Sequence, residues 1–233
     1  MGEIIFADFY KKRDKFAKDT QSVKVYDFNT ILESNGIANP EDSELYYIVD
    51  CLKSIGIVID AKGPWIAGGA ILRTFLNQPL NTDIDLFFSN QGQYDESYKK
   101  MKDHALFVVE SQFSSTFKIL IEHKGVEKEH KIQLVRFIFS EKAVGIINVF
   151  DINVCEIAFD GSRIVIPEES LEGIQTKKMK IHIDRITYPA HTLKRVMKYL
   201  SRGFEIDEKN IQEFADRFII KPNLTKAQSE DRY

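Results

Sequence analysis

Two neighbouring stretches decide the fold of this 233-residue chain: WIAGGAILR at residues 65–73 and TDIDLFF at residues 82–88. The first places a pair of glycines between a short apolar strand and an apolar helix. In the second, aspartates alternate with apolar residues, and this period of two points Asp83 and Asp85 to one face of a strand. Two carboxylates so close together are costly without a compensating positive charge. The pattern therefore predicts a divalent cation here, Mg²⁺ by its preference for carboxylate and phosphate oxygens, with Mn²⁺ as an alternative.

Metal-dependent phosphoryl transfer also needs groups that hold the phosphates and often a third carboxylate. Gly68 and Gly69 let the backbone approach a phosphate and open a helix whose first amides favour anions, although a plain strand-to-helix turn would use the same residues. Asp151 is the second residue of the apolar stretch 150–159, whose alternation predicts a second strand beside the first. A turn-capping role is the alternative for Asp151.

A local excess of positive charge lies near the C-terminus. Residues 177–202 contain eight lysines and arginines against one acid, Asp184. Arg195 and Lys198 are three residues apart on a predicted helix and share one side of it, so we expect them to bind nucleotide phosphates. Arg73, on the helix that follows the glycines, is a further candidate. The alternatives are a solvated helix face and, for Arg73, a surface ion pair.

The rest of the chain is organised around these motifs. The predicted helices span residues 26–33, 44–55, 70–76, 94–104, 168–174, 189–202 and 208–218, and the other predicted strands span 65–67, 82–88, 105–109, 115–122 and 131–139. We expect an N-terminal helical segment that packs on the core (1–62), a catalytic core (63–167), a helical annex (168–220) and a polar tail (221–233).

The order of these motifs resembles the polymerase-beta-like nucleotidyltransferase superfamily, over roughly residues 63–207. The closest likeness is to the head and neck of tRNA nucleotidyltransferases and poly(A) polymerases, where a Gly-Gly motif precedes Asp-x-Asp and a later strand carries the third aspartate. The sequence RVMKYLSRGFEID at residues 195–207 is similar to the end of the neck in that family. The resemblance implies an α+β fold, with a mixed twisted sheet flanked by helices and a C-terminal helical annex.

The same resemblance implies an enzyme that transfers a nucleoside monophosphate from an NTP such as ATP to a hydroxyl group and releases pyrophosphate. Asp83, Asp85 and Asp151 would be the catalytic metal ligands. The family's paired arginines before the third aspartate are replaced by Val149 and Phe150, and its base-selecting Glu-Asp-x-x-Arg element is not found, so CCA addition is not implied.

The acceptor is therefore open. An RNA 3′ end is favoured, with a protein or small-molecule acceptor, as in toxin-like relatives, as the alternative. A catalytically silent nucleotide-binding module is a further alternative. Compact relatives of this kind are common in phage genomes, which makes a phage-type member the expectation.

Composition sets the cellular context. The net charge of −3 excludes a uniformly basic nucleic-acid coat. Cys51 and Cys155 belong to no metal-binding spacing, and free thiols in a reducing compartment are expected. The N-terminus fits neither a signal peptide nor a membrane anchor, so we expect a soluble, cytoplasmic protein without a membrane partner. Tyr188 and Tyr199 could stack on a base, although core packing is the preferred interpretation for both.

Overall fold

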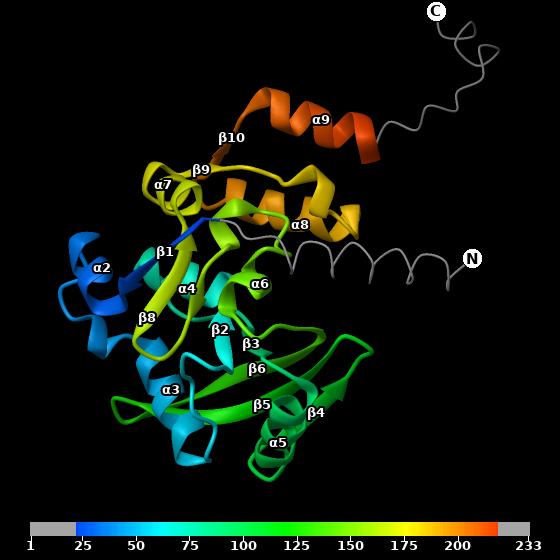
Figure 1. Ribbon diagram of the computed structural model, residues 1–233. Coiled ribbons are helices and arrows are strands. Elements are labelled where there is room, and N and C mark those ends of the chain that lie inside the picture. Colours follow the sequence, from blue (N-terminus) through cyan, green and yellow to red (C-terminus); the bar gives the residue numbers. More distant parts are fainter. Residues whose placement is uncertain (1–21, 219–233) are drawn as a thin grey trace, which may run out of the picture.

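The structure is a computed structural model that describes residues 22–218 (Figure 1). The strands are β1 (Val23–Asp27), β2 (Trp65–Ala67), β3 (Ile84–Phe88), β4 (Phe107–Glu110), β5 (Ser114–His123), β6 (Val126–Phe139), β7 (Ala158–Phe159), β8 (Arg163–Pro167), β9 (Lys178–Met179) and β10 (Glu205–Ile206). The α-helices are α2 (Phe28–Ser34), α3 (Glu44–Ser54), α4 (Gly69–Phe75), α5 (Gln91–Lys102), α6 (Ala143–Ile147), α7 (Glu168–Thr176), α8 (Pro189–Leu200) and α9 (Glu208–Phe218). Short 3-10 helices lie at η1 (Pro40–Asp42), η2 (Asn153–Cys155) and η3 (Ile183–Arg185).

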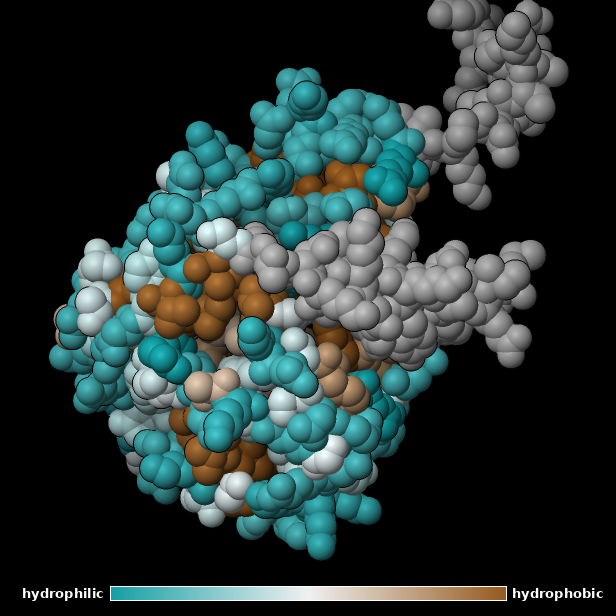
Figure 2. Space-filling view, in the orientation of Figure 1, coloured by the Kyte–Doolittle hydropathy of each residue, from teal (hydrophilic) through white to brown (hydrophobic). Residues whose placement is uncertain are grey.

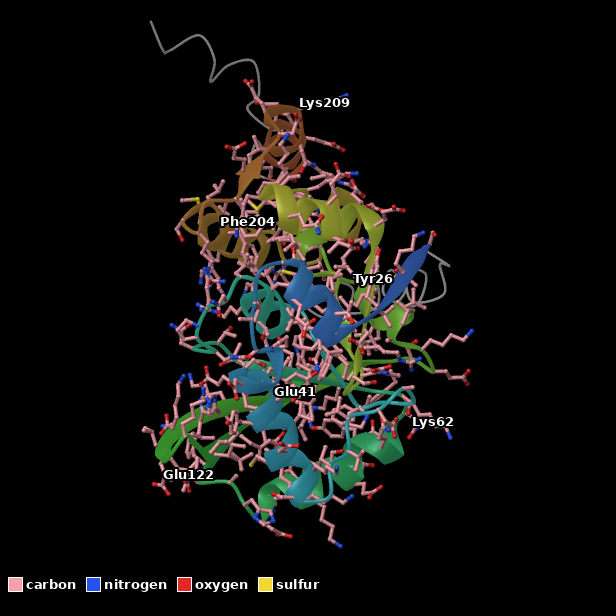
Figure 3. All side chains as sticks on the ribbon, turned by 90° about the vertical axis from the view of Figure 1, so that its left-hand side faces the viewer. Tyr26, Glu41, Lys62, Glu122, Phe204 and Lys209 are labelled. Carbon is pink, nitrogen blue, oxygen red and sulfur yellow. The ribbon has the colours of Figure 1, made fainter. Side chains whose placement is uncertain are left out.

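One mixed sheet of eight strands organises the molecule, in the order β1-β8-β7-β2-β3-β6-β5-β4. β3 and β6 are parallel, and the other neighbours in this sheet are antiparallel. Helices α7, α8 and α9 gather at one end of the molecule, and α3 and α5 lie at the other (Figure 1). In the perpendicular view of Figure 3, Lys209 on α9 and Glu122 on β5 mark these two ends. The predicted α+β class, a mixed sheet flanked by helices, is confirmed.

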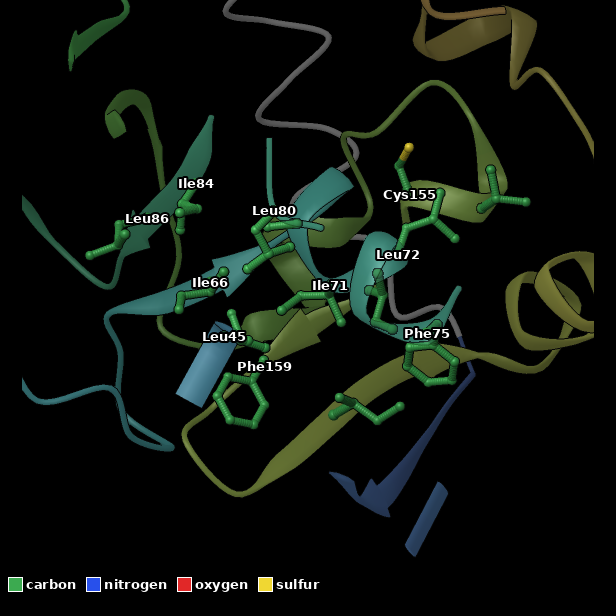
Figure 4. Close-up of a cluster of buried hydrophobic side chains, with 14 of the residues drawn as sticks. Leu45, Ile66, Ile71, Leu72, Phe75, Leu80, Ile84, Leu86, Cys155 and Phe159 are labelled. Atoms are coloured by element: carbon green, nitrogen blue, oxygen red, sulfur yellow. The ribbon is translucent and has the colours of Figure 1, made fainter. Parts of the chain in front are cut away.

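The sheet separates two apolar clusters. Ile66 and Leu86 are paired across β2 and β3 and point into the larger cluster, together with Phe159 (Figure 4). Trp65 and Phe87, one residue along each strand, point into the smaller cluster, where α6 packs. Because side chains alternate along a strand, an aspartate placed between Leu86 and Ile84 must lie on the face of the smaller cluster. This alternation places the Asp85 side chain in the middle of the sheet, on the face of the smaller cluster.

The N-terminal part of the described chain contributes a strand as well as helices. β1 pairs with β8, and its last residue, Asp27, caps α2 by accepting a hydrogen bond from the backbone N–H of Thr30 at 2.9 Å. The predicted helix start at residue 26 is therefore wrong by two residues, since Tyr26 still belongs to the strand. The predicted polar tail lies outside the described residues, and the expected domain boundaries stay predictions.

The predicted strand over residues 150–159 is wrong for most of its length. Ile152 makes an isolated bridge to Ile181, η2 follows, and only the two residues of β7 join the sheet. The cause lies in Asn153, whose side-chain oxygen accepts hydrogen bonds from the backbone N–H groups of Val154 and Lys180 at 2.8 and 2.7 Å. Such a side chain competes with the sheet for backbone partners and turns the chain away from it.

Candidate functional site

The Asp-x-Asp motif places its two carboxylates differently. Asp83 is exposed and precedes β3, whereas Asp85 lies within β3, between Ala67 on β2 and Gln133 on β6. The Oδ1 atom of Asp85 is buried and has no hydrogen-bond partner among residues 22–218. A buried acceptor without a partner is costly, and such atoms in native proteins commonly indicate a missing ligand or ion.

The electrostatics of Asp85 agree with this geometry. Burial, together with the negative charge of Asp83, raises the pKa of Asp85 from 3.8 to about 7. Lys198 and Arg195 act in the opposite direction, so both cations lie within electrostatic range of this carboxylate. The site therefore combines negative charge at β3 with positive charge from α8.

Asp151 reaches the same cavity from a different part of the fold. It lies in a bend after α6 and not on a sheet strand as predicted. Its Oδ2 atom accepts hydrogen bonds from the Thr192 hydroxyl and from the Arg195 guanidinium, both on α8. Within residues 22–218, no three His, Cys, Asp or Glu side chains are grouped so that they could hold a metal ion. Asp151 is thus paired with a cation, and its role as a third metal ligand stays a prediction.

The predicted cations separate into two groups. Lys198 and Arg195 line the cavity, and burial followed by the nearby charge of Arg202 lowers the pKa of Lys198. Arg73 does not line it. The Arg73 side chain is buried, and its Nη1 atom donates a hydrogen bond to the carbonyl of Pro79 at 2.8 Å. The structure thus gives Arg73 a contact that fixes the loop after α4.

The glycine pair forms the turn between β2 and α4 and lines the cavity. Gly68 has a φ of +80°, a backbone conformation that residues with a side chain rarely adopt. Its N–H donates a hydrogen bond to the carbonyl of Ile157 at 2.9 Å. The backbone conformation alone therefore explains a glycine at position 68. α4 has seven residues, so the expected contribution of its first amides to anion binding is small, and a phosphate role for Gly68 and Gly69 stays a prediction.

The cavity itself has a volume of about 440 Å³. Besides the predicted residues, side chains from four further segments line it, and sequence reasoning did not assign them to the site. They include Phe87 on β3, Phe113 before β5, Gln133, Val135 and Phe137 on β6, and Arg185, Thr187 and His191 around the start of α8. The cavity thus combines a charged wall with an aromatic one, as small-molecule sites commonly do.

A buried ionic cluster supports one wall. The carboxylate of Glu156, which is fully buried, contacts the Arg185 guanidinium, the Nε2 atom of His182 at 3.2 Å and the hydroxyl of Ser170 at 2.9 Å. Burial raises the pKa of this carboxyl, but the contacts with His182 and Arg185 outweigh burial and lower it overall. Glu156 therefore ties α7 and η3 to the segment that carries Asp151.

Cys155 also lines the cavity. Its Sγ atom is 2.9 Å from the hydroxyl of Tyr199 on α8, and burial raises the pKa of the thiol to about 11. The predicted free cysteines are confirmed. Tyr199 is buried, in agreement with the preferred core interpretation, and both Tyr199 and Tyr188 line the cavity.

Comparison with known proteins gives the family. The family model described as "Gabija anti-defense 2 family protein" matches residues 39–177, more than half of the chain. The chain belongs to this family. One relative, Gabija anti-defense 2 of Bacillus phage SPbetaL7, is 28% identical over 145 residues, which make up 61% of this chain and 34% of the relative. The match thus spans about a third of that relative's length.

Among solved structures, a CCA-adding enzyme in complex with ATP is similar, with a TM-score of 0.50 and 12% identity over 82% of this chain and 46% of that one. At this identity the likeness supports the fold alone, and it agrees with the predicted nucleotidyltransferase-like architecture. No helix within residues 22–218 is long and apolar enough to cross a membrane.

Proposed function

We propose that this Gabija anti-defense 2 family member is a nucleotidyltransferase that moves a nucleoside monophosphate from an NTP to a hydroxyl group. The observation that carries the proposal is the buried, unpartnered Oδ1 atom of Asp85, on a carboxylate next to Asp83 and opposite Arg195 and Lys198. A polyanion with its cation would satisfy both sides of this cavity at once.

The donor set fits a hard divalent cation. Asp83 and Asp85 would hold Mg²⁺ or Mn²⁺ through carboxylate oxygens, and the bound ion would neutralise charge on the triphosphate during transfer. We assign the binding of phosphate oxygens to Lys198 and Arg195, which both line the cavity. In the reaction the acceptor oxygen bonds to the α-phosphorus, the bond from that phosphorus to the β-bridging oxygen breaks, and pyrophosphate leaves. We assign the hydroxyl proton to Asp151, whose negative charge Arg195 balances in the resting protein.

The family gives this activity a setting. The similar phage protein is named for action against Gabija, and we propose that nucleotidyl transfer by this chain serves the same purpose. The chain matches only 34% of that relative, so the target of the relative is not carried over to this chain.

The test is pyrophosphate release with each of the four NTPs, with Mg²⁺ or with EDTA, in the presence of bacterial lysate as a source of acceptors. Asp83→Asn should lower release about a thousandfold while leaving the fold intact, because removing one of two neighbouring carboxylates relieves repulsion. Asp50→Asn is the matched control, since Asp50 is an exposed aspartate on α3. Full activity in Asp83→Asn would refute the proposal. NTP binding without turnover in any condition would instead indicate a silent nucleotide-binding module.

A further inference from the structure

The face of the sheet that carries Asp85 extends past the cavity to the edge of the sheet. Asp85 pairs with Gln133 on β6, and the Gln133 side-chain amide donates to the Thr116 hydroxyl on β5 at 3.1 Å. Thr116 in turn pairs with Val109 on β4. Paired residues point to the same side of a sheet, so one row of side chains runs from the carboxylate to the edge strand.

This row belongs to an exposed apolar surface. We call it the open face and define it by Phe107 and Val109 on β4, Thr116 and Leu120 on β5, and Gln133 on β6. The side chains of Phe107, Val109 and Leu120 are 61%, 51% and 47% exposed. Residues that alternate with them on β5, such as Phe117 and Ile119, are buried in the larger cluster on the other side of the sheet. Contiguous exposed apolar groups on a globular protein indicate an interaction site.

The charges on the open face favour a protein partner. Lys118, which pairs with Phe107, makes an ion pair with Glu129 at 2.7 Å. The other exposed charges on this side of β5 and β6 are Lys131, Glu122 and Glu127, so acidic side chains are at least as numerous as lysines here. A nucleic acid requires lysines and arginines concentrated along its phosphates, whereas a surface that combines apolar residues with charges of both signs is typical of protein interfaces.

We propose that the open face docks a protein and that a side-chain hydroxyl of this protein is the acceptor. The inference rests on the proposed nucleotidyl transfer and names its acceptor class, in place of the RNA 3′ end that the sequence favoured. Gln133 belongs both to the open face and to the cavity lining, so a protein seated on the face lies next to Asp85. The step is the one given above: the protein's oxygen forms the new bond to the α-phosphorus and pyrophosphate leaves.

The test measures transfer of label from α-phosphate-labelled NTPs into a bacterial lysate, divided into protease-sensitive and ribonuclease-sensitive label. Val109→Glu places a charge among the apolar residues of the open face and should lower protease-sensitive label about tenfold or more. Val25→Glu is the matched control. Val25 is 54% exposed on β1, the opposite edge strand of the same sheet, where Figure 2 also shows apolar residues at the surface over β1 and β8. NTP binding, followed by thermal shift, should be unchanged in both variants.

The outcomes separate the two proposals. Protease-sensitive label that needs Asp83, falls in Val109→Glu and persists in Val25→Glu supports the docking surface. Ribonuclease-sensitive label, or protease-sensitive label equal in the two glutamate variants, overturns it while the transferase proposal stands. A protein that binds no NTP and transfers no label refutes both.

Discussion

Glu156 and Asp85 are two carboxylates beside the same cavity, and the fold treats them in opposite ways. Glu156 is fully buried, yet an arginine, a histidine and a serine hydroxyl surround it and keep its pKa low. Asp85 is less buried as a residue but carries a buried oxygen without a partner, and its pKa is raised to about 7. The protein therefore surrounds the structural carboxylate of Glu156 with partners. It leaves the carboxylate of Asp85, which we assign to ligand binding, partly without them. Perturbed carboxyl groups of the second kind are the better indicators of function.

The largest effect on stability is expected when the partnered carboxylate, Glu156, is neutralised. Glu156→Gln should lower the free energy of unfolding by about 3–5 kcal/mol, because it removes the negative charge of a fully buried carboxylate that Arg185 and His182 both contact. Urea unfolding measures this change. Glu169→Gln is the control, since Glu169 pairs with Lys180 at the surface and should contribute about 1 kcal/mol or less. Equal effects of the two substitutions would mean that the Glu156 cluster is not structural.

A smaller effect of opposite sign is expected for Asp85→Asn in the absence of divalent ions. The pKa of Asp85 in the folded protein, about 7, lies above the ordinary 3.8, so the unfolded chain releases this proton first as the pH rises. The wild type should therefore lose stability relative to Asp85→Asn between about pH 4 and pH 7.

Above that window the variant should be more stable by a few kcal/mol at most, and at about pH 4 the two proteins should be equal. Thermal unfolding across this pH range checks the prediction, and added Mg²⁺ should narrow the gap at high pH. A variant that is less stable than the wild type at every pH would show that Asp85 is needed for packing.

The smallest expected effect is on NTP binding, and it distinguishes Lys198 from Arg73. Lys198→Ala should weaken NTP binding about tenfold, because Lys198 lines the cavity opposite the two aspartates. Arg73→Lys should change NTP binding little, since the Arg73 guanidinium contacts the Pro79 carbonyl and does not reach the cavity. Calorimetric titration with each NTP compares the two variants. The reverse ranking would restore Arg73 as a phosphate ligand.

The sequence predicts those elements whose signals are local. The strand 65–67 and the helix 208–218 agree with the structure residue for residue, because turn residues or helix caps bound each pattern. The prediction of a strand over residues 150–159 fails because a short run of apolar residues does not by itself distinguish a strand from other buried chain. In this segment the Asn153 side chain, and not a neighbouring strand, accepts the backbone hydrogen bonds. One of its two donors, Lys180, is 27 residues further along the sequence and could not be foreseen from local pattern.

The candidate site shows the same division. Asp83, Asp85 and the α8 cations could be found because each lies in a short recognisable pattern. Gln133 and Phe113 have no such pattern, since they reach the cavity through the register of β5, β6 and β3. The position of Arg73 on its helix is compatible both with binding a phosphate and with contacting a nearby loop. Only the folded structure, in which Arg73 donates to the Pro79 carbonyl, distinguishes the two roles.

The Cys155 thiol has a consequence for chemical probing of the cavity. Its pKa of about 11 means that almost none of it is thiolate at neutral pH, and the thiolate is the form that alkylating and oxidising agents attack. A cysteine at the wall of a nucleotide-sized cavity would ordinarily be an attractive point of attachment for a covalent inhibitor. Here such a compound would react slowly, and a reversible ligand that places a cation between Asp83 and Asp85 is the better design.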